Sequence, residues 1–462
     1  MNNQTIAAVA TPSGGALGII RISGSEAISI ASRIFIPYHG LSLAHREAGT
    51  VTFGKIVDSR GYIVDEVLAS LFRSPHSFTG EDSIEFSCHG SQFIMDRIMR
   101  LLLENGCRGA QPGEYTRRAF LNGKMDLSQA EAVADLIASK SAAEHRMAIN
   151  QMKGGFSREL KKLRDKLLHI TSLMELELDF SDHEELEFAD RGELRGLAEE
   201  IRKKIDSLTD SFRAGNAIKN GVPVAIIGET NAGKSTLLNL LLGEDKAIVS
   251  DIHGTTRDVI EDTINIKGTT YRFVDTAGIR HTDDTIESIG IERSIEQMNK
   301  ADIVLWLVDC SGHGTDELLK KTVIGNSSDA RLIILFNKSE ELTQESRDAL
   351  ISKFSDIHAT KLFISAKYNK GIDKLLNLLS ESINLGNISS GDVIVSNLRH
   401  YEALVKAGES IRRAEEAMDM GLSGDLVSED LRQCIFFLSD IVGEVTTEDV
   451  LGNIFKNFCV GK

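Results

Sequence analysis

The spacing of apolar residues along the chain predicts three regions that differ in secondary structure. Short apolar runs bounded by turn residues occupy residues 1–120. They predict strands at 18–24, 51–57, 67–72 and 84–88. Helical spacing over about 26–35 and 92–105 predicts helices between those strands. A mixture of this kind is typical of a small α+β domain.

Beyond about residue 125 the apolar residues recur at steps of three and four, the spacing of amphipathic helices. One series is Leu160, Leu163, Leu167, Ile170 and Met174, and the next is Leu194, Leu197, Ile201, Ile205, Leu208 and Phe212. Ser157 is the expected N-cap of the first helix. The acidic stretch 179–187 separates the two, and its irregular spacing favours a solvated connection over a metal site.

A second pair of helical series follows near the C-terminus. Its members are Leu404, Ala407, Ile411, Ala414 and Met418, and then Leu431, Ile435, Leu438 and Ile441. Because helical segments flank a complete α/β segment, we expect the α/β domain to be inserted into a helical bundle. A glycine-containing linker is expected at 215–221. The predicted domains are 1–120, 121–215 together with 385–462, and 216–384.

The inserted segment alternates strand and helix, which predicts a doubly wound α/β domain with its ligand at the carboxyl ends of the strands. The expected strands are 224–227, 264–266, 271–274, 303–308, 332–336 and 362–364.

One glycine-rich turn in this domain carries a specific chemistry. Residues 228–235 read G-x-x-x-x-G-K-S between an apolar run and a helical pattern. Gly228 and Gly233 allow backbone angles that aim N–H groups at phosphate oxygens. Lys234 supplies a cation for the β- and γ-phosphates, and Ser235 supplies a hydroxyl for Mg²⁺. The alternative is a chance glycine turn, and the context favours a nucleoside triphosphate site.

Further loops of the domain match the parts of a GTP site. Asp275 to Gly278 follow a strand and place a carboxylate near Mg²⁺, and Thr255 and Thr256 lie in a stretch able to close on the metal. Asn337-Lys338-Ser339-Glu340 and Ser365-Ala366-Lys367 stand where GTPases read guanine. Glu340 replaces the usual Asp, with one methylene more.

The means of hydrolysis departs from that of Ras-like enzymes. Ile279 stands where those enzymes carry a water-orienting glutamine, and no arginine finger is evident in cis. Asn231 is a candidate ligand for a monovalent cation. Glu287 is a candidate for orienting water, although a surface carboxylate is the more common fate of such a residue.

Composition limits the environment and partners. No run approaches a membrane span, and the first residues do not resemble a signal peptide. The five cysteines are scattered without metal-ligand spacing, so we expect a cytoplasmic protein. The formal net charge of −16 argues against a surface that coats nucleic acid generally, so any RNA contact must be local or carried by a partner.

An ordered set of motifs makes the chain resemble the MnmE (TrmE) family of tRNA-modifying GTPases over essentially its whole length. The motifs span residues 10–15, 18–24, 77–82, 111–124, 228–235, 254–258, 289–293 and 458–462. From spacing alone, Arg21 and Glu85 belong to a solvated strand face. The resemblance instead implies a dimerising folate-binding domain in which Arg21, Glu85, Lys124 and Lys462 hold 5-formyltetrahydrofolate or a 5,10-methylene form.

The resemblance also implies the full nucleotide site. Asn231, Lys234 and Glu287 are the expected catalytic residues. K⁺ would be held by Asn231, Ser250, Ile252 and Thr255, and Mg²⁺ by Ser235 and Thr256. The expected GTP contacts are Asn231, Ala232, Gly233, Lys234, Ser235, Thr236, Ser250, Asp251, Ile252, His253, Gly254, Thr255, Thr256, Asp275, Thr276, Ala277, Gly278, Asn337, Lys338, Glu340, Ser365, Ala366 and Lys367.

The implied activity is K⁺-activated GTP hydrolysis by a homodimer that works with the FAD-containing partner MnmG (GidA), in a heterotetramer or larger complex. Together they would place a carboxymethylaminomethyl or aminomethyl group on carbon 5 of the wobble uridine of certain tRNAs. Cys459 is a candidate nucleophile, with structural burial as the alternative. A second hypothesis, a ribosome-assembly switch like Era or Der, shares the GTPase domain but predicts a basic RNA-binding appendage, and none is apparent.

Overall fold

The structure analysed is a computed structural model in which the described residues form two compact units. It describes residues 4–179, 191–229, 231–244, 262–267, 269–274, 295–311, 320–321, 323–324, 330–382, 393–456, 458 and 461. The first unit comprises Met1–Ala138, Ala148–Asp206 and Glu402–Lys462, and the second comprises Ser139–Met147 and Ser207–Tyr401.

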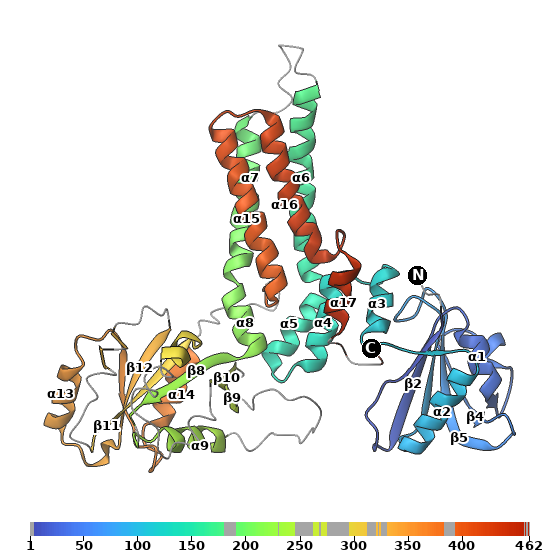
Figure 1. Ribbon diagram of the computed structural model, residues 1–462, viewed down its shortest axis with the longest axis horizontal. Coiled ribbons are helices and arrows are strands. Elements are labelled where there is room, and N and C mark those ends of the chain that lie inside the picture. The colour runs from blue at the N-terminus through green and yellow to red at the C-terminus, as the bar shows by residue number, and fades with distance from the viewer. Residues whose placement is uncertain are drawn as a thin grey trace. The chain divides into compact units, whose positions relative to one another are not determined.

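The N-terminal part of the first unit is built on a seven-stranded sheet, ordered β3-β4-β5-β6-β2-β1-β7 (Figure 1). The strands are β1 (Ile6–Val9), β2 (Leu17–Ser23), β3 (Phe35–Pro37), β4 (Thr50–Val57), β5 (Ile63–Phe72), β6 (Ser83–His89) and β7 (Arg108–Gly109). Two helices, α1 (Ala27–Ile34) and α2 (Gln92–Glu104), supply the other half of its core. The strands and helices predicted in this region are confirmed, whereas β1, β3 and β7 were not predicted.

Strand alternation sorts the side chains of this sheet into two faces. Ile20 and Ile22 of β2 and Ile84 and Phe86 of β6 are fully buried in the core. The residues between them, including Arg21, therefore point away from that core. Arg21 can therefore carry a charge without disturbing the core, and its guanidinium can contact polar groups on the other face of the sheet.

Five shorter helices of the described ranges lie between β3 and β4, between the sheet and the long helices of the bundle, and at the C-terminus. They are η1 (Leu43–His45), α3 (Glu114–Leu121), α4 (Leu127–Ala138), α5 (Ala142–Met152) and the C-terminal α17 (Glu448–Lys456). Leu127 and Ala130 of α4 form a small buried cluster with Leu451 and Phe455 of α17. The C-terminal helix is thereby packed beside residues that follow the N-terminal sheet in the chain.

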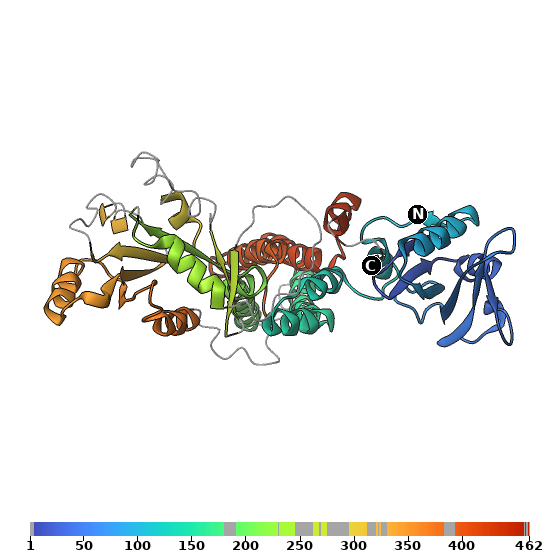
Figure 2. The same ribbon diagram turned by 90° about the horizontal axis from the view of Figure 1, so that it is seen from below.

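Four long helices form a bundle, seen from two directions in Figures 1 and 2. They are α6 (Gly155–Asp179), α7 (Arg191–Asp210), α15 (Leu398–Asp419) and α16 (Gly424–Val442). The predicted apolar series are largely buried, and ion pairs such as Arg202–Glu415 at 2.8 Å join neighbouring helices. The predicted N-cap is wrong: α6 begins at Gly155, so Ser157 lies inside the helix, where its hydroxyl is 3.0 Å from that of Ser128.

The second unit contains a six-stranded sheet ordered β13-β12-β11-β8-β10-β9, in which only the edge pair β9/β10 is antiparallel. The strands are β8 (Val222–Gly228), β9 (Asp262–Ile266), β10 (Thr269–Phe273), β11 (Ile303–Asp309), β12 (Arg331–Asn337) and β13 (Thr360–Phe363). The helices are α8 (Phe212–Asn220), α9 (Lys234–Glu244), η2 (Ser339–Glu341), α13 (Gln344–Lys353) and α14 (Ile372–Ser382).

This sheet has a buried core on each face, as the doubly wound prediction requires. Leu305 and Leu307 belong to one core, and Val304 and Trp306 belong to the other. All six predicted strands are confirmed. The predicted linker at 215–221 is wrong, because these residues continue helix α8, which ends where Gly221 takes a φ of 76°.

The cysteines in the described ranges are free thiols. Cys88, Cys107, Cys310 and Cys434 are unpaired, and burial raises the pKa of Cys434 to about 12. No helix in the described ranges is long and apolar enough to cross a membrane. Within the same ranges, no group of three or more His, Cys, Asp or Glu residues is placed to hold a metal ion.

Candidate functional site

The glycine-rich turn joins the carboxyl end of β8 to the N-terminus of α9, at the edge of the parallel sheet where ligands bind. Gly228 has a φ of 150° and Gly233 a φ of 99°, so both adopt backbone angles that disfavour other residues. A Cβ on Gly233 would lie 2.4 Å from Nδ2 of Asn337, and one on Gly228 would lie 2.5 Å from the carbonyl oxygen of Leu307. The two glycines are required by space as well as by backbone angle.

Asn231 and Lys234 give this turn its polar character. Asn231 is held with a φ of 65°, a left-handed conformation that Asn tolerates better than most residues. The Lys234 ammonium donates to the carbonyl oxygens of Gly228 and Glu229, each at 2.7 Å. Burial lowers the pKa of Lys234. A cation over a helix N-terminus, surrounded by a tight turn, is suited to binding phosphate.

Asn337 connects two loops of the site to the end of β12. It ends β12, is 3% exposed, and donates from Nδ2 to the carbonyl oxygen of Ala232 at 2.7 Å. Its Oδ1 accepts from the backbone N–H of Ala366 at 3.0 Å. One side chain therefore fixes the phosphate turn and the Ser365-Ala366-Lys367 loop relative to the end of its own strand.

Lys338 and Asp309 form an ion pair beside this clamp, with Nζ and Oδ2 2.5 Å apart. Asp309 ends β11 directly opposite Asn337 in the strand register. Burial opposes ionisation of Asp309, but bonds from Lys338 and Ser311 outweigh it and lower the pKa of its carboxyl. Sequence reasoning missed Asp309. Its position at the end of a buried strand adjoining β12 was the available signal.

The remaining guanine-loop residues lie on the same edge. The Ser339 hydroxyl donates to the carbonyl oxygen of Ile364 at 2.9 Å, which joins the two predicted loops. Ser365 and Lys370 exchange backbone hydrogen bonds, with N···O distances of 2.9 and 3.1 Å. Glu340 and Lys367 are exposed at the ends of these loops. The geometry thus brings the two loops together and leaves both charged side chains accessible.

Many predicted contacts fall outside the described residues. They are Ser250, Asp251, Ile252, His253, Gly254, Thr255, Thr256, Asp275, Thr276, Ala277, Gly278, Glu287, Cys459 and Lys462. The described part of the nucleotide site consists of Asn231, Ala232, Gly233, Lys234, Ser235, Thr236, Asn337, Lys338, Glu340, Ser365, Ala366 and Lys367.

A second polar site lies on the sheet of the first unit. Arg21 and Glu85 are register partners on β2 and β6, with Nε donating to Oε1 at 2.7 Å. Arg21 also donates from Nη1 to the carbonyl oxygen of Gly461 at 3.0 Å. Residues more than four hundred positions apart in the chain therefore meet at one guanidinium.

Aromatic rings flank this guanidinium. The Arg21 Cζ lies 5.8 Å from the ring centroid of Phe78 and 5.6 Å from that of Tyr115, whose hydroxyl donates to the Arg21 carbonyl oxygen at 2.8 Å. Lys124 is exposed and donates from Nζ to the carbonyl oxygen of Pro75 at 2.9 Å. The Arg21–Glu85 pair and its two flanking rings offer a carboxylate acceptor and aromatic surfaces, which is chemistry suited to a flat heterocycle with amino donors.

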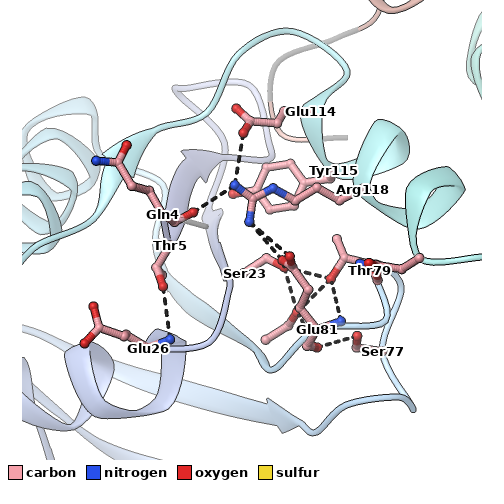
Figure 3. A network of polar contacts seen from close by, with 12 residues as sticks. Gln4, Thr5, Ser23, Glu26, Ser77, Thr79, Glu81, Glu114, Tyr115 and Arg118 are labelled. Carbon is pink, nitrogen blue, oxygen red and sulfur yellow. Dashed lines mark hydrogen bonds and ion pairs between the residues drawn. The ribbon is translucent and has the colours of Figure 1, made fainter. Parts of the chain in front are cut away.

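A network of polar contacts holds α3 against this sheet (Figure 3). Arg118 donates to Glu81 Oε2 at 2.9 Å, to the carbonyl oxygen of Gln4 at 2.8 Å and to Glu114 Oε1 at 3.1 Å. Glu81 also accepts from the hydroxyl of Ser23, two residues beyond Arg21, at 2.8 Å. Because Tyr115 belongs to the same helix, the network positions the ring that flanks Arg21. Arg118 lies in the 111–124 motif, but its role was not predicted.

The sheet topology, the phosphate turn and the paired loops at its carboxyl edge define a P-loop protein of the GTPase class. Comparisons with known proteins are more specific. The "MnmE helical domain" family matches residues 127–459, and the "GTP-binding protein TrmE N-terminus" family matches residues 5–124.

Relatives named "tRNA modification GTPase MnmE" match over the full length. The protein of Bacteroides thetaiotaomicron is 59% identical over 100% of both chains, and that of Christiangramia forsetii is 49% identical over 100% of this chain and 99% of its own. The solved FeoB G domain of Methanococcus jannaschii is 24% identical, with a TM-score of 0.25 over 35% of this chain and 96% of its own. The chain belongs to the MnmE family of tRNA modification GTPases.

Proposed function

We propose that this chain is a K⁺-activated GTP hydrolase that modifies carbon 5 of the wobble uridine of certain tRNAs. It would add a carboxymethylaminomethyl or aminomethyl group with the flavoprotein MnmG, which carries FAD, using a tetrahydrofolate one-carbon unit. The observation that carries the proposal is the presence in one chain of the Asn337-clamped phosphate turn and the Arg21–Glu85 site. Family membership supports it further.

In the nucleotide site, Lys234 would neutralise phosphate charge, and Ser235 and Thr256 would hold Mg²⁺. Asn231, Ser250, Ile252 and Thr255 would hold K⁺, and Glu287 would orient water. These metal ions would supply charge that stabilises the transferring phosphoryl group, in the place of an arginine finger. The place of Asn231 in the phosphate turn, between Gly228 and Gly233, supports its part in this assignment.

The cation requirement is tested by measuring GTP hydrolysis in K⁺ and in Na⁺ at matched ionic strength. We expect K⁺ to stimulate the wild-type protein and to lose its effect in Asn231→Ala. Asn377→Ala, an exposed residue of the same unit, is the matched control and should retain the stimulation. Equal wild-type rates in the two salts would contradict K⁺ activation.

In the second site, Glu85 would accept hydrogen bonds from the amino edge of a pterin, while Arg21 orients Glu85 through their bond at 2.7 Å. Lys124 and Lys462 would face the glutamate carboxylates of the folate. Calorimetry with 5-formyltetrahydrofolate tests this assignment. Glu85→Gln should weaken binding by about tenfold or more, because an ionised acceptor gives the stronger bond. Glu66→Gln, on the neighbouring strand β5, should not, and equal losses in the two variants would contradict the site.

The proposed assembly is a cytoplasmic homodimer that binds MnmG in a heterotetramer or larger complex and contacts tRNA. Sedimentation of the full chain with and without the flavoprotein tests it. We expect a dimer alone and a heavier species in the mixture. A protein that sediments as a monomer and does not bind the flavoprotein would contradict the proposed assembly.

A further inference from the structure

A hollow of about 400 Å³ lies along the seam between α6 and α7, in the helical bundle. Its lining residues are Glu159, Lys162, Leu163, Lys166, Glu200, Ile201, Lys203 and Lys204. Leu163 and Ile201 are buried and form its apolar floor, while the charged side chains form its rim. None of these residues has a part in the nucleotide or folate sites assigned above. We call this feature the lysine groove.

The lysine groove is basic in an acidic protein. Its four lysines and two glutamates leave a formal surplus of two positive charges, against −16 for the whole chain. Outside the lining, residues 158–166 of α6 add three basic side chains and one acidic one, while Glu199 of α7, which pairs with Lys203 at 2.8 Å, offsets one positive charge. A local basic feature of this kind is what an acidic protein needs in order to approach a polyanion.

The lysines of the groove form ion pairs with glutamates, and other anions can replace these glutamates. Lys166 pairs with Glu200 at 2.6 Å, and Lys204 pairs with Glu159 at 3.6 Å, so each pair crosses the seam. Lys162 also pairs with Glu159 at 2.7 Å and Lys203 pairs with Glu199 at 2.8 Å, yet these two lysine side chains are 69% and 67% exposed. Ion pairs at such exposed positions contribute little, so phosphates can replace the glutamates as partners at low cost.

We propose that the lysine groove docks the sugar–phosphate backbone of tRNA. This inference rests on the proposed function, which requires tRNA contact, and it identifies the surface that makes it. Lys162 and Lys166 lie one helical turn apart, ~6 Å along the axis, so they present a row of ammonium groups to successive phosphates. Glu159 and Glu200 accept hydrogen bonds from 2′-hydroxyls, which are donors that RNA offers and DNA lacks.

Fluorescence anisotropy with labelled tRNA and the full-length protein, measured across a series of KCl concentrations, tests the proposal. The variant is Lys162→Gln with Lys203→Gln, chosen because these two side chains are the most exposed of the four. The control is Lys300→Gln with Lys353→Gln, which removes the same charge from exposed positions in the other unit. Circular dichroism and GTP hydrolysis check that all three proteins are folded and active.

We expect the groove variant to bind tRNA about tenfold more weakly and the slope of log affinity against log salt to fall by about 1 per lysine, while the control changes neither. If the groove variant binds tRNA as tightly as the wild-type protein, with the same slope of log affinity against log salt, the proposed docking of tRNA in the groove is wrong. The proposed function would be unaffected by that result. If the groove variant binds tRNA normally but binds the flavoprotein more weakly, the groove contacts a protein partner, and the proposed docking of tRNA there is wrong. If the active wild-type protein binds no tRNA alone, the groove is overturned, and if it binds none together with the flavoprotein either, the proposed function itself fails.

Discussion

Replacement of Asn337 by Ala tests the loop clamp, because this buried side chain makes two hydrogen bonds to two different loops. Each such bond contributes about 1 kcal/mol net, and leaving the buried Ala366 N–H without its acceptor adds about 1–2 kcal/mol. We therefore expect Asn337→Ala to lower the free energy of unfolding of the second unit by roughly 2–4 kcal/mol. It should also weaken nucleotide binding, since two loops of the site lose their connection.

The assay is urea unfolding followed by the fluorescence of Trp306, the single tryptophan of the chain, which is buried in β11 of the same unit. A loss of 2 kcal/mol in binding corresponds to about 30-fold weaker affinity for a fluorescent GTP analogue. Asn377→Ala makes the same substitution at an exposed position and should stay within about 0.5 kcal/mol of wild type. An unfolding midpoint for Asn337→Ala equal to that of Asn377→Ala would refute the clamp.

Further predictions concern the first unit. Arg118→Met should lower its stability by about 2–4 kcal/mol, because Glu81 and Glu114 lose a buried cation. Urea unfolding followed by circular dichroism measures this, and a change under about 0.5 kcal/mol would contradict it. Burial opposes ionisation of Glu114, but bonds from Arg108 and Arg118 outweigh it and lower its pKa. The stabilisation that ionised Glu114 contributes is therefore present above its unfolded pKa and is lost as the pH falls through its folded pKa. In Glu114→Gln the melting temperature should therefore decrease less between neutral and acid pH than in the wild-type protein, and identical pH profiles of the melting temperature would contradict this. The buried Cys434 thiol, with its pKa raised to about 12, should react with iodoacetamide at pH 8 only on unfolding. Peptide mapping by mass spectrometry follows this residue, and rapid labelling of Cys434 in the native protein would contradict its burial.

The elements that the sequence predicted well are those in which apolar residues recur at one regular spacing along the whole element. The strands of the second sheet, strands β2, β4, β5 and β6 of the first sheet and the long bundle helices belong to this group, whereas the short strands β1, β3 and β7 were not predicted. The buried positions Leu160, Leu167 and Ile170 follow their predicted period. Local signals at helix ends were less reliable. Ser157 has the right chemistry for an N-cap, and the two glycines of 215–221 are typical of a linker. The helix α6 nevertheless begins before Ser157, and α8 continues through Gly215 to Asn220.

The phosphate turn was predictable because its residue types are required at fixed spacing in one short stretch. The partners that position the sites were not, because they meet only in the fold. Arg21 and Glu85 are 64 residues apart, and nothing in their local sequence distinguishes them from a solvated strand face. Asp309 and Arg118 likewise acquire their partners from neighbouring strands and loops.

The proposed tRNA modification is tested most directly by the mass of the wobble nucleoside after reaction. Unmodified tRNA would be incubated with the full-length protein, the flavoprotein with its FAD and reductant, 5,10-methylenetetrahydrofolate, GTP and either glycine or ammonium, in K⁺ and in Na⁺. We expect carboxymethylaminomethyl uridine with glycine and aminomethyl uridine with ammonium, in K⁺ and only with GTP. Unmodified uridine in every K⁺ reaction, while GTP is hydrolysed, would contradict the proposed function.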